Sequence, residues 1–141
     1  MATKSVGEIM TRKLEKINSS ATAQEVAKKM SEIKVSSLLV TDDTGKPIGI
    51  VTEGNLVRKV IADKFKASAV NVQQIMFSPP VTIDPNSSME IAADIMNQNK
   101  VKHLLVVENE DLNKPLGIIS ATDFAGYLKD TAKFQQNNQG N

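Results

Sequence analysis

An internal repeat constrains the fold of this chain more than any other sequence feature. The run VGEIMTRKLEKI from position 6 returns as VQQIMFSPPVTI from position 72, and KVSSLLV from position 34 returns at the same spacing as KVKHLLV from position 100. KPIGIVTEGNL from position 46 returns as KPLGIISATDF from position 114 at a slightly larger spacing, because a polar turn between apolar runs has lengthened. We therefore expect two similar halves packed around a pseudo-twofold axis, with ligands in the cleft between them.

Composition excludes several classes of function. A chain of 141 residues with 40% hydrophobic residues is long enough to bury a core, and its net charge of +1 gives no overall attraction to nucleic acid or to an anionic membrane. The absence of cysteine removes disulfides and thiolate metal sites, and a single histidine argues against a transition-metal centre. No apolar run approaches the roughly 20 residues of a membrane helix, and the N-terminus lacks a signal-peptide core. We expect a soluble, cytoplasmic protein without metal, membrane or nucleic-acid partners.

Local patterns predict the same element order in both halves. In the first half a short strand at 15–17 precedes a helix that opens with the Ser/Thr-x-x-Glu spacing of a capping box at Thr22, and residues 37–41 and 47–52 read as a hairpin before a helix from Gly54. The second half repeats this order with a strand at 81–83 and a capping box from Ser87. Each half is therefore predicted as β-α-β-β-α. The apolar faces expected to be buried, within the chain or across a homodimer, are Val26, Met30 and Ile33 in the first helix and Ile91, Ile95 and Met96 in its counterpart.

This order, the IM doublet ahead of each first strand and the run Gly-Ile-[Val/Ile]-[Thr/Ser]-x-x-[Asp/Asn] resemble the tandem cystathionine β-synthase (CBS) domain pair, or Bateman module. The resemblance implies an α/β (α+β) fold of two CBS repeats packed sheet to sheet, at 5–63 and 72–130, with a connection at 64–71. Residues 131–141 are polar and low in complexity, and we expect a disordered tail there.

The resemblance also implies a function. CBS pairs are regulatory modules that bind AMP, ADP or ATP between their repeats, commonly as homodimers, and here the regulated partner would be a separate protein. Two alternatives stay open: S-adenosylmethionine as the ligand, or an interaction or scaffold protein with weak or no nucleotide binding. The sequence has no P-loop, no dinucleotide fingerprint, no metal-binding carboxylate cluster and no nucleophile placed beside the histidine, so we expect neither an enzyme nor ATP hydrolysis.

One cleft is predicted around Asp123. A carboxylate only accepts hydrogen bonds, which suits the two hydroxyls of a ribose, and Asp123 lies at the start of a helix, where backbone N–H groups favour anions. The alternative is structural: Ser120 or Thr122 caps the helix while Asp123 complements its dipole. For the run Ser36, Ser37 and Leu38 in the first half, the alternative to a ligand role is a plain strand core. The resemblance implies a lining of Lys16, Ile17, Val35, Ser36, Ser37, Ser120, Ala121, Thr122 and Asp123.

The other cleft departs from the family pattern, because Asn55 stands where the second half has Asp123. An uncharged amide makes weaker hydrogen bonds to a sugar than a carboxylate does. We expect Lys102 and His103 to recognise phosphate in this cleft, more tightly once His103 is protonated below about pH 6.5. The alternatives are a solvated lysine and a satisfied strand histidine; Arg58 and Lys59 are read as surface charges. The implied lining is Thr52, Asn55, Val81, Thr82, Val101, Lys102 and His103.

Overall fold

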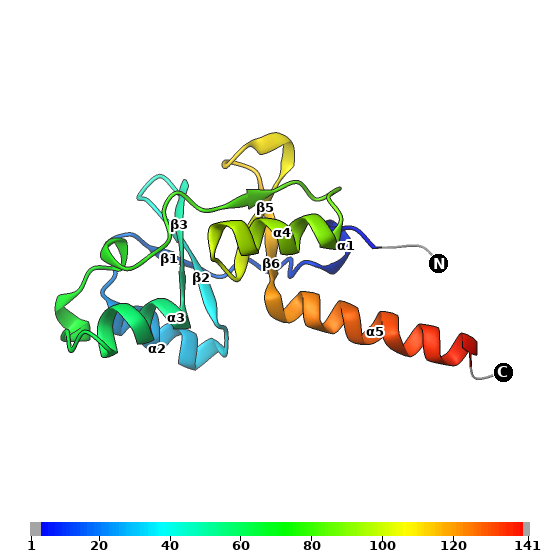
Figure 1. The fold of residues 1–141 in the computed structure, drawn as a ribbon. Coiled ribbons are helices and arrows are strands. Elements are labelled where there is room, and N and C mark those ends of the chain that lie inside the picture. The colour runs from blue at the N-terminus through cyan, green and yellow to red at the C-terminus, as the bar shows by residue number, and fades with distance from the viewer. Residues whose placement is uncertain (1–3, 140–141) are drawn as a thin grey trace. The chain divides into compact units, whose positions relative to one another are not determined.

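The computed structural model describes residues 4–139, with side chains through residue 132. It contains two compact units, which we call the central unit, Lys13–Val81, and the terminal unit, Met1–Arg12 together with Thr82–Asn141. Each unit holds one three-stranded sheet, ordered β1-β2-β3 in the central unit and β4-β5-β6 in the terminal unit (Figure 1). The predicted mixed fold of two β-α-β-β-α repeats is confirmed.

The central unit is built on β2, which pairs in parallel with β1 and antiparallel with β3. The capping box expected at Thr22 is present, and the helix that it opens packs against β2 and α3. Val26, Met30, Leu38 and Val40 are buried in its core. Its elements are β1 Lys16–Asn18, α2 Ala23–Ile33, β2 Ser37–Thr41, β3 Pro47–Thr52, α3 Glu53–Leu56, the π-helical turn η1 Val57–Ile61, and the 3-10 turns η2 Ala67–Ala69 and η3 Val72–Gln74.

The terminal unit repeats this arrangement around β5, which pairs in parallel with β4 and antiparallel with β6. Ser88 caps α4 through its hydroxyl, one residue later than the predicted start of the box, and α4 packs against β5 and α5. The elements are α1 Val6–Ile9, β4 Thr82–Ile83, α4 Met89–Asn99, β5 His103–Val107, the 3-10 turn η4 Glu108–Glu110, β6 Pro115–Ser120 and α5 Ala121–Gln139.

The structural units do not coincide with the sequence repeats, because the segments that carry the IM doublets are exchanged. Thr11 pairs with Ile118 of β6 through hydrogen bonds of 2.9 and 3.0 Å, and Phe77 pairs with Ile50 of β3 through bonds of 2.9 and 3.1 Å. The start of the first repeat therefore belongs to the terminal unit, and the start of the second belongs to the central unit.

Glycines permit these crossings. A Cβ on Gly117 would lie 2.5 Å from the Thr11 carbonyl oxygen, and one on Gly49 would lie 2.7 Å from that of Phe77. Both distances are shorter than real Cβ contacts, so the backbones can approach this closely only where a side chain is missing.

Three of the six expected apolar helix positions are not buried within the chain. Val26, Met30 and Met96 are buried. Ile95 is partly exposed, and Ile33 and Ile91 are 38% and 49% exposed. Ile33 is the last residue of α2 and Ile91 lies in the first turn of α4, so both stand at helix ends.

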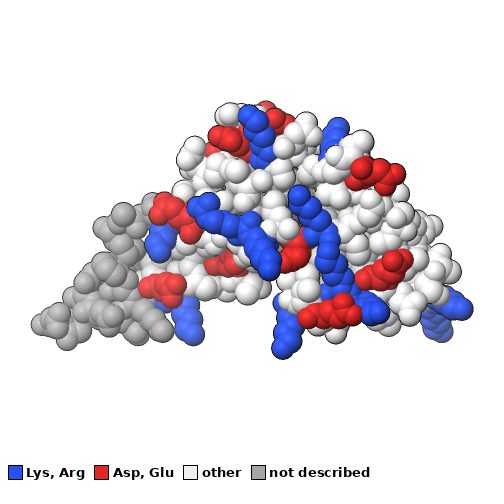
Figure 2. Space-filling view, turned by 180° about the vertical axis from the view of Figure 1, so that it is seen from behind, with Lys and Arg blue, Asp and Glu red and all other residues white. Residues whose placement is uncertain are grey.

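The structure also differs from the predicted tail, because α5 continues through residues 131–139 as helical backbone. The polar residues there continue the hydrogen-bond ladder of an existing helix, which is easier than nucleating a new one. Positions 140–141 of the predicted tail lie outside the described residues. Within residues 4–139, no helix is both long and apolar enough to span a membrane. Acidic and basic side chains are interspersed on the face shown in Figure 2, as the small net charge suggests.

Candidate functional site

Asp123 lies in the first turn of α5, directly after β6, at the position predicted from the sequence, and we call this first turn the Asp123 turn. The Ser120 N–H donates to Asp123 Oδ2 at 2.9 Å, and the Asp123 N–H donates to Ser120 Oγ at 3.1 Å. This reciprocal pair is a capping box, so the capping alternative is confirmed for Ser120. Asp123 is half-buried, whereas Thr122 and Ala121 are exposed. Within the described part of the chain, the other carboxylate oxygen, Oδ1, has no hydrogen-bond partner and can still accept from a ligand.

Asn55 forms the same turn in the central unit. The Thr52 N–H donates to Asn55 Oδ1 at 2.8 Å, and the Asn55 N–H donates to Thr52 Oγ1 at 3.1 Å. Asn55 is only 1% exposed, and a Cβ on Gly54 would meet the Arg58 guanidinium at 2.4 Å. Asn55 is therefore more enclosed than Asp123, and its side chain is neutral.

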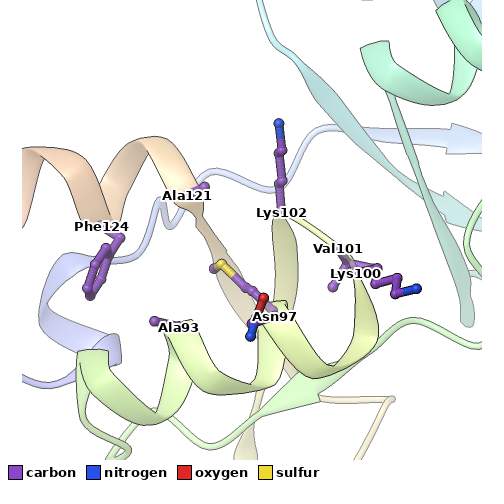
Figure 3. Close-up of a pocket in the computed structure, with 8 residues that line it drawn as sticks. Ala93, Asn97, Lys100, Val101, Lys102, Ala121 and Phe124 are labelled. Atoms are coloured by element: carbon purple, nitrogen blue, oxygen red, sulfur yellow. The ribbon is translucent and has the colours of Figure 1, made fainter.

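A pocket of about 420 Å³ lies in the terminal unit beside the Asp123 turn, and we call it the α4–α5 pocket. Phe124 on α5 and Ala93 on α4 face each other across it, and Lys102 extends from the residue just before β5 (Figure 3). Apolar side chains line much of it, and Lys100 and Lys102 belong to its lining, although Figure 3 shows both lysine side chains extending away from Phe124 and Ala93. Its lining residues are Ala93, Met96, Asn97, Lys100, Val101, Lys102, Ala121 and Phe124.

His103 lies next to the Asp123 turn rather than apart from it. It pairs with Ser120 across the β5–β6 ladder, and its Nδ1 is buried without a hydrogen-bond partner among the described residues. Burial lowers the pKa of His103 below its usual 6.5; the charge of Asp123 opposes this effect and that of Lys102 adds to it. The protonation of His103 expected below about pH 6.5 is therefore shifted to lower pH.

Within each unit the structure joins predicted residues that the sequence assigned to different clefts. In the terminal unit the Ala121 N–H donates to the Lys102 carbonyl at 2.9 Å. In the central unit the Glu53 N–H donates to the Ser36 carbonyl at 3.0 Å, and Ser37 pairs with Thr52. In both units the segment that enters the middle strand thus lies beside the turn that leaves the last strand.

The other predicted residues lie on the first strands and beside them. Lys16 and Ile17 are in β1, paired with Leu39 and Val40 of β2, and Thr82 opens β4. The Lys29 ammonium donates to the Lys16 carbonyl. The assignment of residues from both repeats to one shared cleft stays a prediction. The predicted residues in this group that are at least partly exposed are Lys16, Ile17, Val35, Ser36, Ser37, Val81 and Thr82.

Sequence reasoning missed the α4 and α5 contributors to the pocket. Ala93, Met96, Asn97 and Lys100 recur at the spacing of one helix face, and of these four only Met96 belongs to the apolar face predicted from the sequence. Phe124 follows Asp123 directly in the sequence, but it was not predicted as a residue of the site. No group of three or more metal-ligating side chains occurs among residues that the structure describes.

The CBS domain family model matches residues 6–62 and 72–130, so the chain belongs to the CBS domain family and carries two CBS domains. An uncharacterized protein of Methanopyrus kandleri is 31% identical over 123 residues, which are 87% of this chain and 62% of that protein. An uncharacterized 17.7 kDa protein of Acidianus ambivalens is 30% identical over 135 residues, 96% of this chain and 79% of that protein. The chain thus spans less than two thirds of the first relative's length.

Solved structures of CBS proteins share the fold. The hexameric CBS-CP12 protein from bloom-forming cyanobacteria is 32% identical with a TM-score of 0.79, over 89% of this chain and 68% of that one. A CBS domain protein of Pyrobaculum aerophilum complexed with AMP is 24% identical with a TM-score of 0.72, over 84% and 88% of the two chains. A CBS domain pair in complex with 5′-methylthioadenosine and S-adenosyl-L-methionine is 22% identical with a TM-score of 0.75, over 89% and 99%.

Proposed function

We propose that this chain is a regulatory module that binds an adenine nucleotide, AMP, ADP or ATP, at the Asp123 turn. In this proposal Asp123 accepts hydrogen bonds from the ribose hydroxyls, and the apolar wall of the α4–α5 pocket receives the base. Lys100 and Lys102 supply positive charge for the phosphate. The bound nucleotide regulates a separate protein, and the module itself has no enzymatic activity.

The half-buried carboxylate of Asp123 carries this proposal. One of its oxygens is fixed by the Ser120 N–H at 2.9 Å, so the side chain is held in place before any ligand arrives. Its partial burial strengthens hydrogen bonds to a hydroxyl compared with a fully exposed carboxylate. The adjoining volume of about 420 Å³ is within the usual range of small-molecule sites.

The family supplies the class of ligand. The Pyrobaculum protein is complexed with AMP, and the other ligand-bound pair holds two compounds that contain adenosine. These structures share a fold with this chain at identities under 25%, so they support an adenine ligand as a class and leave its identity to experiment.

A second candidate function rests on the capping boxes themselves. Both turns satisfy their own backbone groups without a ligand, so each is a stable structural device in its own right. A CBS protein that acts as a scaffold, with weak or no nucleotide affinity, would show this geometry as well. S-adenosylmethionine remains the alternative ligand for a binding module.

Thermal melting separates these candidates. A ligand that binds only the folded state stabilises it by about 2.7 kcal/mol at a hundredfold excess over its dissociation constant. We expect AMP, ADP or ATP to raise Tm in wild type and to lose most of that effect in Asp123→Asn, which can retain the cap but removes the charge. A flat response to every adenine compound would favour the scaffold, and a response to S-adenosylmethionine alone would reassign the ligand.

We further propose that the chain forms a homodimer and does not hydrolyse ATP.

Exposed apolar side chains at Ile33 and Ile91 are suited to a homodimer contact, which light scattering at tens of micromolar would detect as a doubled mass. We expect no phosphate release from ATP that survives repurification, because the sequence has no P-loop and no group of three or more metal-ligating side chains occurs among the described residues.

A further inference from the structure

The central unit contains a second pocket, which we call the connection pocket. Its volume is about 280 Å³, and its walls come from the π-helical turn η1, the connection between the repeats, and η3. Neither predicted cleft includes any of its lining residues. The residues that matter here are Lys59, Phe65, Lys66, Val70, Gln74 and Ile75.

Lys59 is fixed at the wall of this pocket. Its Nζ donates to the Ile75 carbonyl oxygen at 3.3 Å and lies 5.5 Å from the ring centroid of Phe77. An ammonium has three N–H donors, so this contact leaves donors for a ligand while the side chain is already oriented. Lys59 is exposed, as expected for a surface charge, and its ammonium is in addition held by this contact. It sits in a π-helical turn, a type of helix often found at functional sites.

Charge and polarity define what the pocket can bind. Lys59 and Lys66 both line it, and none of its lining residues is acidic. Val70 and Ile75 form a buried apolar floor, and Phe65 stands at the pocket with 59% of its surface exposed. Such a site suits an anionic group near the ammonium ions and a compact apolar body against the floor.

From this geometry we propose that the connection pocket binds a small organic anion, a carboxylate or a phosphate ester with a compact apolar body. Its volume lies at the lower end of small-molecule sites, so the ligand is smaller than a nucleotide. The site is separate from the Asp123 turn, because all its residues belong to the central unit. Lys59 contacts the anionic group, and Phe65 and Ile75 contact the apolar body.

Backbone amide NMR of the whole chain tests this site with benzoate, phenyl phosphate and the neutral control phenol. We expect both anions to shift amides in residues 59–75, more strongly than phenol. Lys59→Gln should weaken their binding roughly tenfold or more, since it removes a charge-assisted contact. Lys28→Gln, on the exposed face of α2 in the same unit, is the matched control and should bind as wild type. A preference between the two anions identifies the anionic group.

Equal binding by Lys59→Gln and Lys28→Gln, equal shifts with phenol, or shifts confined to other residues would each overturn the proposal. The spectrum of Lys59→Gln without any probe should show a folded protein. A loss of probe-induced shifts in this variant then reflects the missing contact between Lys59 and the anion. Adding AMP distinguishes this site from the nucleotide proposal, because AMP should shift residues around Asp123 and leave the affinity for benzoate unchanged. Failure of AMP to bind would leave the connection pocket unaffected.

Discussion

Asp123 and Asn55 occupy matching positions in the two repeats, and each completes a capping box with the last residue of a strand. They differ in charge and in exposure: Asp123 is half-buried and anionic, whereas Asn55 is 1% exposed and neutral. A ligand hydroxyl can therefore make a charge-assisted hydrogen bond at one turn and not at the other.

The first prediction compares these two residues. Asp123→Asn should weaken adenosine and AMP roughly ten- to hundredfold, because charge-assisted hydrogen bonds are worth about 1.5–3 kcal/mol. Asn55→Ala should cost less affinity, although it removes a cap and should lower stability by about 0.5–2 kcal/mol. Titration calorimetry gives the affinities and urea unfolding gives the stabilities. Equal losses of affinity in the two variants would contradict the role of the charge.

The second prediction concerns His103. Because its folded-state pKa lies below the usual 6.5, the unfolded chain binds more protons in the window between the two values. The free energy of unfolding should therefore fall as pH drops below about 6.5, and level off once His103 is protonated in the folded state. His103→Gln should lose this dependence while keeping the rest of the acid profile. Urea unfolding between about pH 7.5 and pH 5 measures both curves, and parallel curves would show that His103 does not contribute.

At the scale of elements, the close crossings over β3 and β6 depend on glycine. The third prediction is that Gly117→Ala destabilises the chain by about 1–3 kcal/mol, because its Cβ would lie 2.5 Å from a backbone oxygen that cannot move freely. Gly126→Ala is the control: nothing lies within 4 Å of its Cβ site in α5, and alanine should stabilise that helix by about 0.5–1 kcal/mol. Denaturant unfolding of both variants gives the comparison. If Gly117→Ala left the free energy of unfolding unchanged, the backbone at Thr11 and β6 would have to separate readily.

Most helices and strands could be predicted because their signals are local. The Thr22 box and the short apolar runs of the hairpins act over a few residues, and the structure confirms them. The exchange of the segments around Thr11 and Phe77 could not be predicted, since it depends on contacts between residues far apart in sequence. The α4–α5 pocket could not be predicted from the sequence for a related reason. One face of α4 contributes both to the core and to the pocket, and the periodicity of apolar residues does not distinguish these two roles.

At the scale of the whole molecule, the exchange means that each structural unit contains residues from both sequence repeats. Val6 and Val72 open the two copies of the repeated sequence, and both side chains are fully buried. The Val6 N–H donates to the Ser87 carbonyl at 2.9 Å, and the Val72 N–H donates to the Ala21 carbonyl at 2.9 Å. Each valine therefore stabilises one structural unit, although it opens the sequence repeat that forms most of the other unit.

The last prediction uses this pair. Val6→Ala and Val72→Ala should each cost about 1.5–3 kcal/mol, since each removes fully buried methyl groups and leaves a small cavity. Local opening should concentrate in the affected unit. Hydrogen exchange followed by mass spectrometry should show faster exchange in residues 82–120 for Val6→Ala and in residues 16–52 for Val72→Ala. The opposite pattern would mean that each repeat folds as its own unit. Uniform acceleration in both variants would mean that the whole chain opens in one cooperative step, because neither unit could then open without the other.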